Sequence, residues 1–159
     1  DPEMSRGLGD VYKEALDSVK TSDNFTFSSP LAYNAIPDLL QLRSSVFELG
    51  KIYFLLLDDT ETIRGIAEFE TSAISRYITN SVAILSYVSC PSKNLDEFVK
   101  GCASLINKVA LCRTTKIRTY IPVDQPEAIE SFSHSGFEKA AFLKEEYGKI
   151  DVCMMDYFV

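Results

Sequence analysis

Residues 82–110 read VAILSYVSCPSKNLDEFVKGCASLINKVA, and the spacing of the apolar residues changes within this stretch. Val82 to Val88 is a short apolar run that is typical of a buried strand. After Pro91, apolar residues recur every three or four positions, which is the pattern of a helix with one buried face. That face consists of Leu95, Phe98, Val99, Cys102, Leu105, Ile106, Val109 and Ala110. The stretch therefore predicts a core strand followed by an amphipathic helix.

Strand-like segments flank this pair on both sides. Before it, residues 51–57 and 62–70 predict a hairpin around a turn at residues 58–60. After it, residues 116–123 predict a strand, and residues 124–135 predict a helix that ends at Gly136. Residues 137–143 and 150–158 predict two closing strands. Asn94 with Glu97, and Asp124 with Glu127, have the spacing of helix capping boxes.

This order of elements predicts an α/β or α+β domain with a single mixed central sheet and helices on its faces. Nearer the start of the chain, residues 10–20 predict a helix, Phe25 and Phe27 a short extended piece, and residues 31–47 one or two short helices. We expect one domain over residues 1–159, with N-terminal helices in residues 10–49 and the sheet core in residues 50–159. Residues 1–3 precede Met4, the expected natural start, and are treated as a remnant outside the fold.

The charge balance restricts the classes of partner. The 159 residues include 16 Lys and Arg against 23 Asp and Glu, which gives a net charge of -7. This charge opposes broad attraction to nucleic acid or to anionic lipid, so neither is expected as a partner. No apolar run approaches the ~18 residues that span a bilayer, and no secretory signal pattern is present near the start. We expect a cytoplasmic protein.

The cysteines and the histidine do not form a metal-binding pattern. Cys90, Cys102, Cys112 and Cys153 lack C-x-x-C spacing, and His134 is the single histidine, so no metal site is expected. The sequence predicts buried thiols that act as small apolar side chains. A nucleophilic Cys90 with His134 as its base is an alternative that two residues alone do not establish.

Three short motifs carry a family resemblance. They are Arg64-Gly65-Ile66-Ala67 in the second predicted strand, Ser135-Gly136-Phe137-Glu138 after the second late helix, and Gly148-Lys149-Ile150-Asp151 leading to Met154-Met155. In this order, and with this succession of strands and helices, residues 50–159 resemble a divergent member of the GNAT superfamily of acyl-CoA N-acyltransferases.

The resemblance implies a site for acetyl-CoA or another acyl-CoA. GNAT enzymes hold the pantetheine arm against a splayed strand, here the strand that ends near Tyr87, and this implies cofactor contacts from Val88, Ser89 and Cys90. They seat the pyrophosphate on a glycine-rich turn, Gln/Arg-x-x-Gly-x-Gly/Ala, at the start of the next helix. This chain departs from that turn, because it has one glycine, Gly101, between residues 93 and 103.

The register of this helix decides whether its first amides are free. If Asn94 caps the helix, the cap consumes the amides that a phosphate would use, and Asp96 and Glu97 in the first turn repel an anion. If the helix instead begins near Phe98, an atypical phosphate site remains. That site would consist of Lys100, Gly101, Cys102 and Ala103.

The catalytic positions of the family are also altered. GNAT enzymes often place an acidic tyrosine four residues before the glycine of the Gly-Phe pair, and this chain has Phe132 there. His134 is the best substitute acid, because the ordinary pKa of histidine lies near neutral pH. The simpler interpretation is a partly exposed residue near a helix end that has no catalytic role. Glu68 is the candidate general base, and Glu70 lies on the same face of the strand. The simpler interpretation is that both carboxylates belong to a solvated strand face and have no catalytic role.

Two functions follow from these resemblances. The first is a divergent N-acyltransferase that moves an acetyl or other acyl group from CoA to a small amine or a peptide amine. The second is a catalytically inactive GNAT-like module that binds a protein partner, because three segments resemble ornithine decarboxylase antizyme. These segments are Ser92-Lys93, Ser131-Phe-Ser-His-Ser-Gly-Phe-Glu138 and Asp151-x-Cys153-x-Met155-x-Tyr157.

Overall fold

The computed structural model describes residues 23–30, 51–71, 82–109 and 113–159. The helices expected in residues 10–20 and 31–47 lie outside these ranges. The described elements are β1 (Asn24–Ser28), β2 (Lys51–Leu57), β3 (Ile63–Thr71), β4 (Val82–Pro91), the short 3₁₀ helix η1 (Ser92–Asn94), α3 (Leu95–Val109), β5 (Lys116–Pro122), α4 (Pro126–His134), β6 (Glu138–Tyr147) and β7 (Ile150–Phe158).

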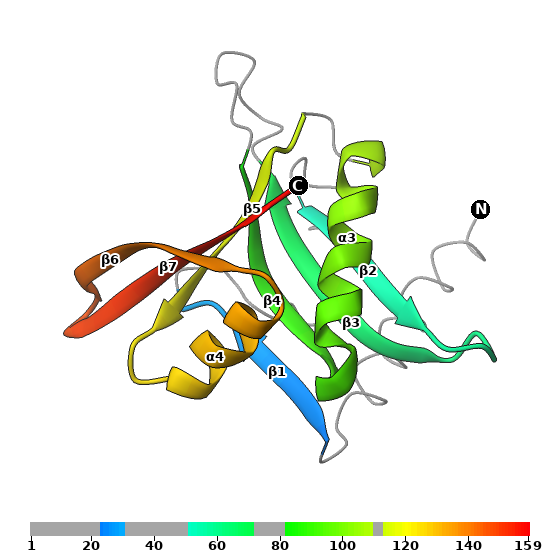
Figure 1. Ribbon diagram of the computed structural model, residues 1–159, viewed down its shortest axis with the longest axis horizontal. Helices are drawn as coiled ribbons and strands as arrows, with labels where there is room; N and C mark the ends of the chain where they lie inside the picture. The colour runs from blue at the N-terminus through cyan, green and yellow to red at the C-terminus, as the bar shows by residue number, and fades with distance from the viewer. Residues whose placement is uncertain (1–22, 31–50, 72–81, 110–112) are drawn as a thin grey trace, which may run out of the picture.

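The strands form one mixed sheet, as the sequence predicts. Its order is β2-β3-β4-β5-β7-β6, with β1 added beside β4 (Figure 1). Only β4 and β5 run parallel, and the other neighbours are antiparallel. The fold class, a single mixed sheet with flanking helices, is confirmed.

One continuous apolar core lies between the sheet and the two helices α3 and α4. Leu85 on β4 and Ile117 on β5 contribute to it from the sheet, Ile106 from α3 and Phe132 from α4. The apolar face predicted for the helix explains this arrangement, because an amphipathic helix buries one stripe and leaves the other in water. Among the side chains of that face whose burial the structure describes, Leu105 is the exception, since it is exposed on the outer side of α3.

The strands β4 and β5 diverge from a common start. Their parallel pairing covers only Val82 to Ile84 on β4 and Lys116 to Arg118 on β5. Beyond this point, β4 continues to Pro91 and β5 to Pro122 without pairing with each other. The sheet therefore opens a gap between these two strands, next to the start of α3 (Figure 1).

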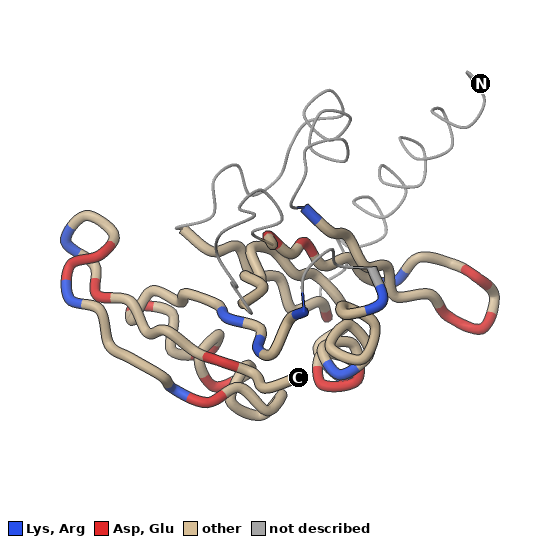
Figure 2. The backbone as a smooth tube through the Cα atoms, turned by 90° about the horizontal axis from the view of Figure 1, so that it is seen from above, with Lys and Arg blue, Asp and Glu red and all other residues tan. Residues whose placement is uncertain are grey.

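The predicted hairpin of β2 and β3 is confirmed, and one carboxylate organises its turn. Asp58 accepts hydrogen bonds from the backbone N–H of Thr60 at 2.9 Å and of Thr62 at 3.0 Å, and from Arg64 Nε at 2.7 Å. A hydrogen bond from the Thr60 hydroxyl, together with those from Arg64 and the two backbone amides, lowers the pKa of Asp58 well below its usual range. Charged residues gather at the tips of both hairpins, far from the helices (Figure 2).

The start of α4 differs from its predicted cap. The helix begins at Pro126 with Gln125 at the N-cap, and no side chain bonds the first amides there. The predicted pairing of Asp124 with Glu127 is wrong, because the chain enters the helix one residue later than expected. Gly136, with a φ of 93°, ends the turn after α4 as predicted.

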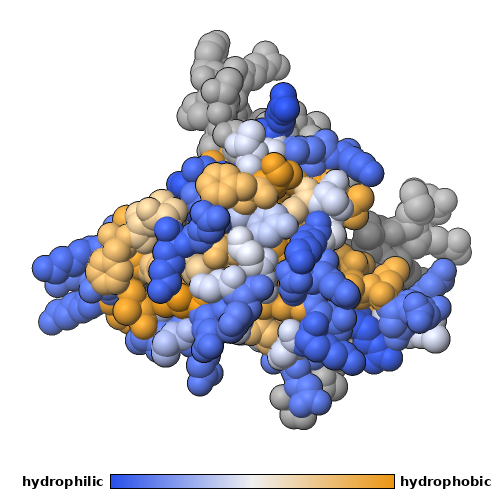
Figure 3. All heavy atoms as spheres, viewed as in Figure 1, coloured by the Kyte–Doolittle hydropathy of each residue, from blue (hydrophilic) through white to orange (hydrophobic). Residues whose placement is uncertain are grey.

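The strands β6 and β7 form a long hairpin that projects from the sheet. Most of β6 is exposed, and Phe142 retains 62% of its surface in water. Apolar side chains show on this hairpin in Figure 3, whereas hydrophilic ones cover much of the surface around the two helices.

A buried carboxylate ties β7 to β5. Arg118 donates from Nε to Oδ1 of Asp156 at 2.7 Å and from Nη2 to Oδ2 at 2.9 Å, and Lys116 Nζ lies 3.2 Å from Oδ2. The Arg118 hydrogen bonds are the main reason that the pKa of Asp156 lies below its ordinary value of 3.8.

We expect the replacement Asp156→Asn to destabilise the protein at neutral pH and to matter less in acid. Because the folded-state pKa is lowered, the ion pair stabilises fully above the ordinary carboxyl pKa and is lost as pH falls through the folded-state pKa. Urea unfolding of both proteins from neutral pH to about pH 2 measures the difference in the free energy of unfolding. A difference that stays constant over this range would contradict the assignment.

Candidate functional site

The strand β1 occupies the gap between β4 and β5. It pairs antiparallel with β4 over five residues, from Asn24 opposite Pro91 to Ser28 opposite Tyr87. At one end, Ser92 N–H donates to the carbonyl of Asp23 at 3.1 Å, and at the other, Ser29 N–H donates to the carbonyl of Ser86 at 2.9 Å. Hydrogen-bonded pairs alternate along an antiparallel ladder. The backbone N–H and C=O groups of the odd-numbered residues 23–29 therefore point toward β4. Pro91, which lacks an N–H, lies opposite Asn24 in a pair that is not hydrogen-bonded across the ladder.

Side chains close the gap above β1. The hydroxyl of Thr119 on β5 donates to the carbonyl of Leu85 on β4 at 3.2 Å. The hydroxyl of Ser29 donates to the carbonyl of Tyr120 at 3.2 Å. These two bonds join β4 and β5 just beyond their parallel start, and β1 then pairs with β4 alone up to Pro91.

Aromatic rings hold β1 in this position. Phe25 and Phe27 of β1 meet the ring of Phe132 edge to face, with centroids 5.4 and 5.1 Å apart. Phe137 contacts the same ring at 5.1 Å. Phe132 is fully buried and Phe27 is 2% exposed, so β1 is part of the core. The position where the family often has an acidic tyrosine is therefore an apolar contact between β1 and α4.

The residues predicted to hold the pantetheine arm are already paired. Val88 lies opposite Phe27 and Cys90 lies opposite Phe25 in the ladder with β1. Ser89 pairs with Ile66 on β3, and its hydroxyl shares a 2.7 Å hydrogen bond with that of Thr26. The structure differs from the prediction because a strand of the same chain takes the edge of β4 that the cofactor would use.

The residues predicted for the pyrophosphate lie inside a helix. The later helix start near Phe98 is wrong, since η1 begins at Ser92 and α3 follows at Leu95. Lys100, Gly101, Cys102 and Ala103 therefore belong to the second and third turns of α3, where backbone amides bond within the helix. Cys102 and Ala103 are also buried in the core.

The predicted cap at Asn94 is also absent. Asn94 is the last residue of η1, and no side chain bonds the first amides of this turn. The first amide, that of Ser92, instead donates to Asp23 just before β1. Asp96 forms an ion pair with Lys100 at 2.8 Å on the exposed side of α3.

The two candidate catalytic residues do not meet. Glu68 is 2% exposed, and its carboxylate accepts a hydrogen bond from the Ser86 hydroxyl at 2.8 Å and lies 3.6 Å from Lys51 Nζ. The interpretation of Glu68 as part of a solvated face is therefore wrong. His134 is exposed at the end of α4, on the helix side of the sheet, whereas Glu68 alternates with the core residue Ala67 and points to the other side.

The described thiols, those of Cys90, Cys102 and Cys153, are buried as predicted, and Cys112 lies outside the described residues. Cys90 is fully buried, and burial raises its pKa to about 12, so the reactive thiolate is not populated at neutral pH. Burial also raises the pKa of Cys102 to about 12. The burial of Cys90 therefore disfavours the alternative of a nucleophilic Cys90 activated by His134.

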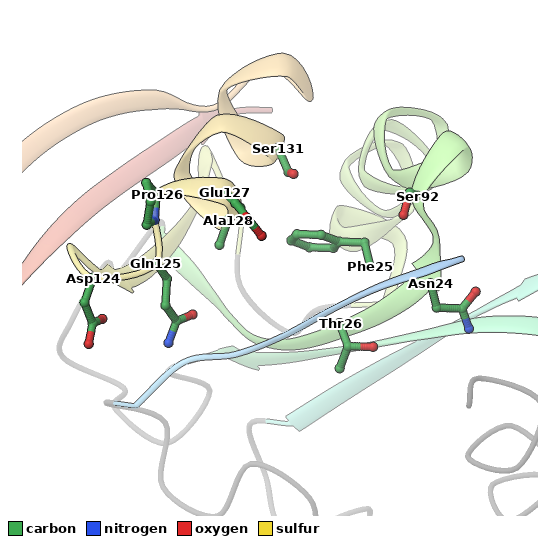
Figure 4. A pocket seen from close by; sticks show the side chains of 10 residues that line it. All are labelled: Asn24, Phe25, Thr26, Ser92, Asp124, Gln125, Pro126, Glu127, Ala128 and Ser131. Atoms are coloured by element: carbon green, nitrogen blue, oxygen red, sulfur yellow. The ribbon is translucent and has the colours of Figure 1, made fainter. Parts of the chain in front are cut away.

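Two hollows lined by described residues lie beside β1. The larger, about 770 Å³, lies between the start of β1 and the start of α4, with Phe25, Thr26, Gln125 and Glu127 in its lining (Figure 4). The smaller, about 210 Å³, lies between the start of α3 and the end of α4. Its lining brings together Lys93 and His134 with Ser92, Ser131 and Ser135.

The sequence alone did not reveal the role of residues 23–29. The alternation of Phe25 and Phe27 predicts an extended piece, and the structure confirms it. Alternation gives no information about which strand of the sheet an extended piece will join, because that contact spans about sixty positions of sequence. Ser29 and Thr119, which help close the gap, carry no local signal.

Among the described helices, none has the length and the apolar character needed to cross a membrane. In the same part of the chain, no three acidic, cysteine or histidine side chains come together as a metal site.

No family model matches the chain, and no curated protein matches it significantly. Solved structures of spermidine N-acetyltransferases match its fold. A chimera of the Vibrio cholerae enzyme SpeG and hSSAT has a TM-score of 0.60 at 16% identity, and the match covers 86% of this chain and 96% of that one. A second such chimera has a TM-score of 0.63 at 16% identity, with coverage of 94% and 90%.

The Vibrio cholerae enzyme in complex with CoA and spermine also matches. Its TM-score is 0.60 at 13% identity, and the match covers 87% of this chain and 96% of that one. These identities are too low to carry an activity from one protein to the other, but the agreement extends over most of both chains. This chain therefore has the fold of the GNAT superfamily of acyl-CoA N-acyltransferases.

Proposed function

We propose that this chain is a catalytically inactive GNAT-fold module that acts by binding a protein partner. The pairing of β1 with β4 is the observation that carries this proposal. GNAT enzymes place the pantetheine arm along this edge, and here Val88 and Cys90 face β1 instead. Binding of CoA in that mode would require β1 to leave, which would expose Phe27 and the fully buried Phe132 to water.

The resemblance to ornithine decarboxylase antizyme supports a binding role. Its three segments are far apart in the sequence but close in the fold. Ser92 and Lys93 line the smaller hollow together with Ser131 and His134. In the third segment, the ring of Tyr157 lies 5.5 Å from that of Phe137 in the second. The resemblance implies ornithine decarboxylase as the partner.

We expect free CoA and acetyl-CoA to leave the melting temperature unchanged at millimolar concentration. A ligand that binds only the folded state would stabilise it by about 2.7 kcal/mol at one hundred times its dissociation constant. Differential scanning fluorimetry measures this shift, and calorimetric titration checks it without a dye. A saturable shift with CoA would contradict the inactive module.

The partner is tested with the same preparation. We expect a stable complex with ornithine decarboxylase in size-exclusion chromatography and weaker binding by Lys93→Glu, because Lys93 is exposed beside the smaller hollow. Lys108→Glu is the matched control, since Lys108 is also an exposed lysine but lies in the last turn of α3, at the other end of that helix from Lys93. If both variants lost the same amount of affinity for ornithine decarboxylase, the effect would come from the change in net charge and not from the surface around Lys93.

A second candidate is an N-acetyltransferase that moves an acetyl group from CoA to an amine. The likeness to spermidine N-acetyltransferases, one of them bound to CoA and spermine, favours it. In this case Glu68, beside Ser86 and Lys51, is the candidate base, and the cofactor displaces β1. Acetylation of spermidine by the intact protein, abolished in Glu68→Gln, would support this candidate over the binding module.

A further inference from the structure

No other described strand pairs with the outer edge of β1. The alternation that turns the odd-numbered residues toward β4 turns the N–H and C=O of Thr26 and Ser28 the other way. Within the described ranges, β1 pairs with β4 alone, and no backbone hydrogen bond between described residues reaches these groups of Thr26 and Ser28. Such an edge is a template on which another extended chain can form a ladder.

The larger hollow runs along this edge. Residues 24–26 of β1 form one wall, and residues 124–128 at the start of α4 form the other. In Figure 4 the ring of Phe25 points from β1 toward α4, and the side chain of Gln125 points from the start of α4 toward β1. The hollow has a volume of about 770 Å³, and its lining follows β1 from Asn24 to Thr26. An added strand requires about 4.8 Å of space beside its neighbour.

The charge of this hollow selects its occupant. Its described lining includes the carboxylates of Asp124 and Glu127 and no lysine or arginine. Neither carboxylate forms an ion pair with another described residue. Such a lining repels a diphosphate and attracts a cationic side chain.

We propose that this hollow binds an extended, basic segment of the partner protein, which adds a strand to the outer edge of β1. The backbone of the segment pairs with Thr26 and Ser28, and its lysine or arginine side chains reach Asp124 and Glu127. Strand addition of this kind gives affinity through main-chain hydrogen bonds and specificity through alternate side chains. The proposal rests on the binding function proposed above and adds the place and the chemistry of one contact.

Hydrogen exchange of the ¹⁵N-labelled full chain tests the geometry. The probe is a short acetylated peptide of alternating valine and lysine. We expect it to slow exchange of the Thr26 and Ser28 amides at least about tenfold, because these amides gain partners. The amide of Phe27, which already faces β4, is expected to change little. Unchanged exchange at Thr26 and Ser28 with saturating peptide would overturn the proposal.

Charge reversal tests the chemistry. The double variant Asp124→Lys and Glu127→Lys is expected to bind the valine and lysine peptide about tenfold more weakly, in line with two exposed ion pairs. The same variant is expected to prefer a peptide of alternating valine and glutamate. Equal affinity of both proteins for both peptides would remove the two carboxylates from the site.

A proline tests the ladder itself. Thr26→Pro removes the outward N–H and is expected to abolish the protection at Ser28, whereas Thr26→Ala keeps that N–H. Both variants lose the hydroxyl bond to Ser89, so their difference reports on the backbone. The charge-reversed variant decides the outcome if the proline variant fails to fold.

Spermine separates strand addition from simple cation binding. If spermine displaces the peptide and no peptide protects Thr26, the hollow is a cation site and the strand proposal is wrong. If ornithine decarboxylase binds Thr26→Pro and Thr26→Ala equally well, strand addition fails while the proposed binding function stands. A shift of the melting temperature with CoA would instead contradict the proposed function.

Discussion

Replacement of Phe132 by alanine is expected to lower the free energy of unfolding by about 3–5 kcal/mol, the range for removal of a fully buried phenylalanine. Phe132 is 0% exposed and its ring contacts Phe25, Phe27 and Phe137. The cavity would lie between β1 and α4, so the variant would lose the aromatic contacts that hold β1 against β4. Urea unfolding followed by circular dichroism measures the change.

Amide exchange locates the damage. In Phe132→Ala, the amides of Phe25 and Phe27 are expected to exchange faster than those of β6 and β7, because local opening follows the loss of local packing. Phe142→Ala is the control, since it removes the same side chain from a position that is 62% exposed on β6. It is expected to change stability by no more than about 0.5 kcal/mol. Equal losses in the two variants would contradict the buried role of Phe132.

The variant Phe132→Tyr separates structure from chemistry. It restores the hydroxyl that many GNAT enzymes have at this position, but here the added oxygen enters a sealed apolar contact. A buried hydroxyl without a partner costs about 1–3 kcal/mol. We expect a less stable protein with no acetyl transfer to spermidine. Transfer in this variant would favour the enzyme candidate.

The fold was predictable because its signals are local. The apolar periodicity of residues 82–110 predicts a strand and a helix, and the structure contains β4 and α3 there. The same holds for β2 and β3, whose turn is encoded by Asp58 and its nearest neighbours. Periodicity reports which residues face a core, and this is a property of each segment by itself.

The state of the candidate site was not predictable in the same way. Whether the edge of β4 is free depends on a contact between Phe25 and Cys90, which no local pattern records. The first turn of α3 also differs from the prediction, because Asn94 and Glu97 have the spacing of a cap but the helical turn begins at Ser92. There the amide of Ser92 bonds to Asp23, a partner from the distant segment that leads into β1.

The second large effect is expected from Gly65→Ala on β3. A Cβ at this position would lie 2.8 Å from Cys90 Cβ and 2.9 Å from the carbonyl oxygen of Ser89. Both neighbours belong to β4 and cannot rotate away, so β3 and β4 must separate. Overpacking of this kind costs about 1–3 kcal/mol and more where backbone must move. Because Cys90 also lies opposite Phe25, the strain reaches the contact with β1.

Gly101→Ala is the matched control for this prediction, because nothing lies within 4 Å of the Cβ it would add. Gly101 is inside α3, where alanine is favoured over glycine by about 0.8–1 kcal/mol, so this variant is expected to be more stable than the parent. The two glycine replacements should therefore shift the urea midpoint in opposite directions. A Gly65→Ala protein as stable as the parent would show that β3 and β4 can separate here at no cost, and would contradict the close approach of Gly65 to Cys90.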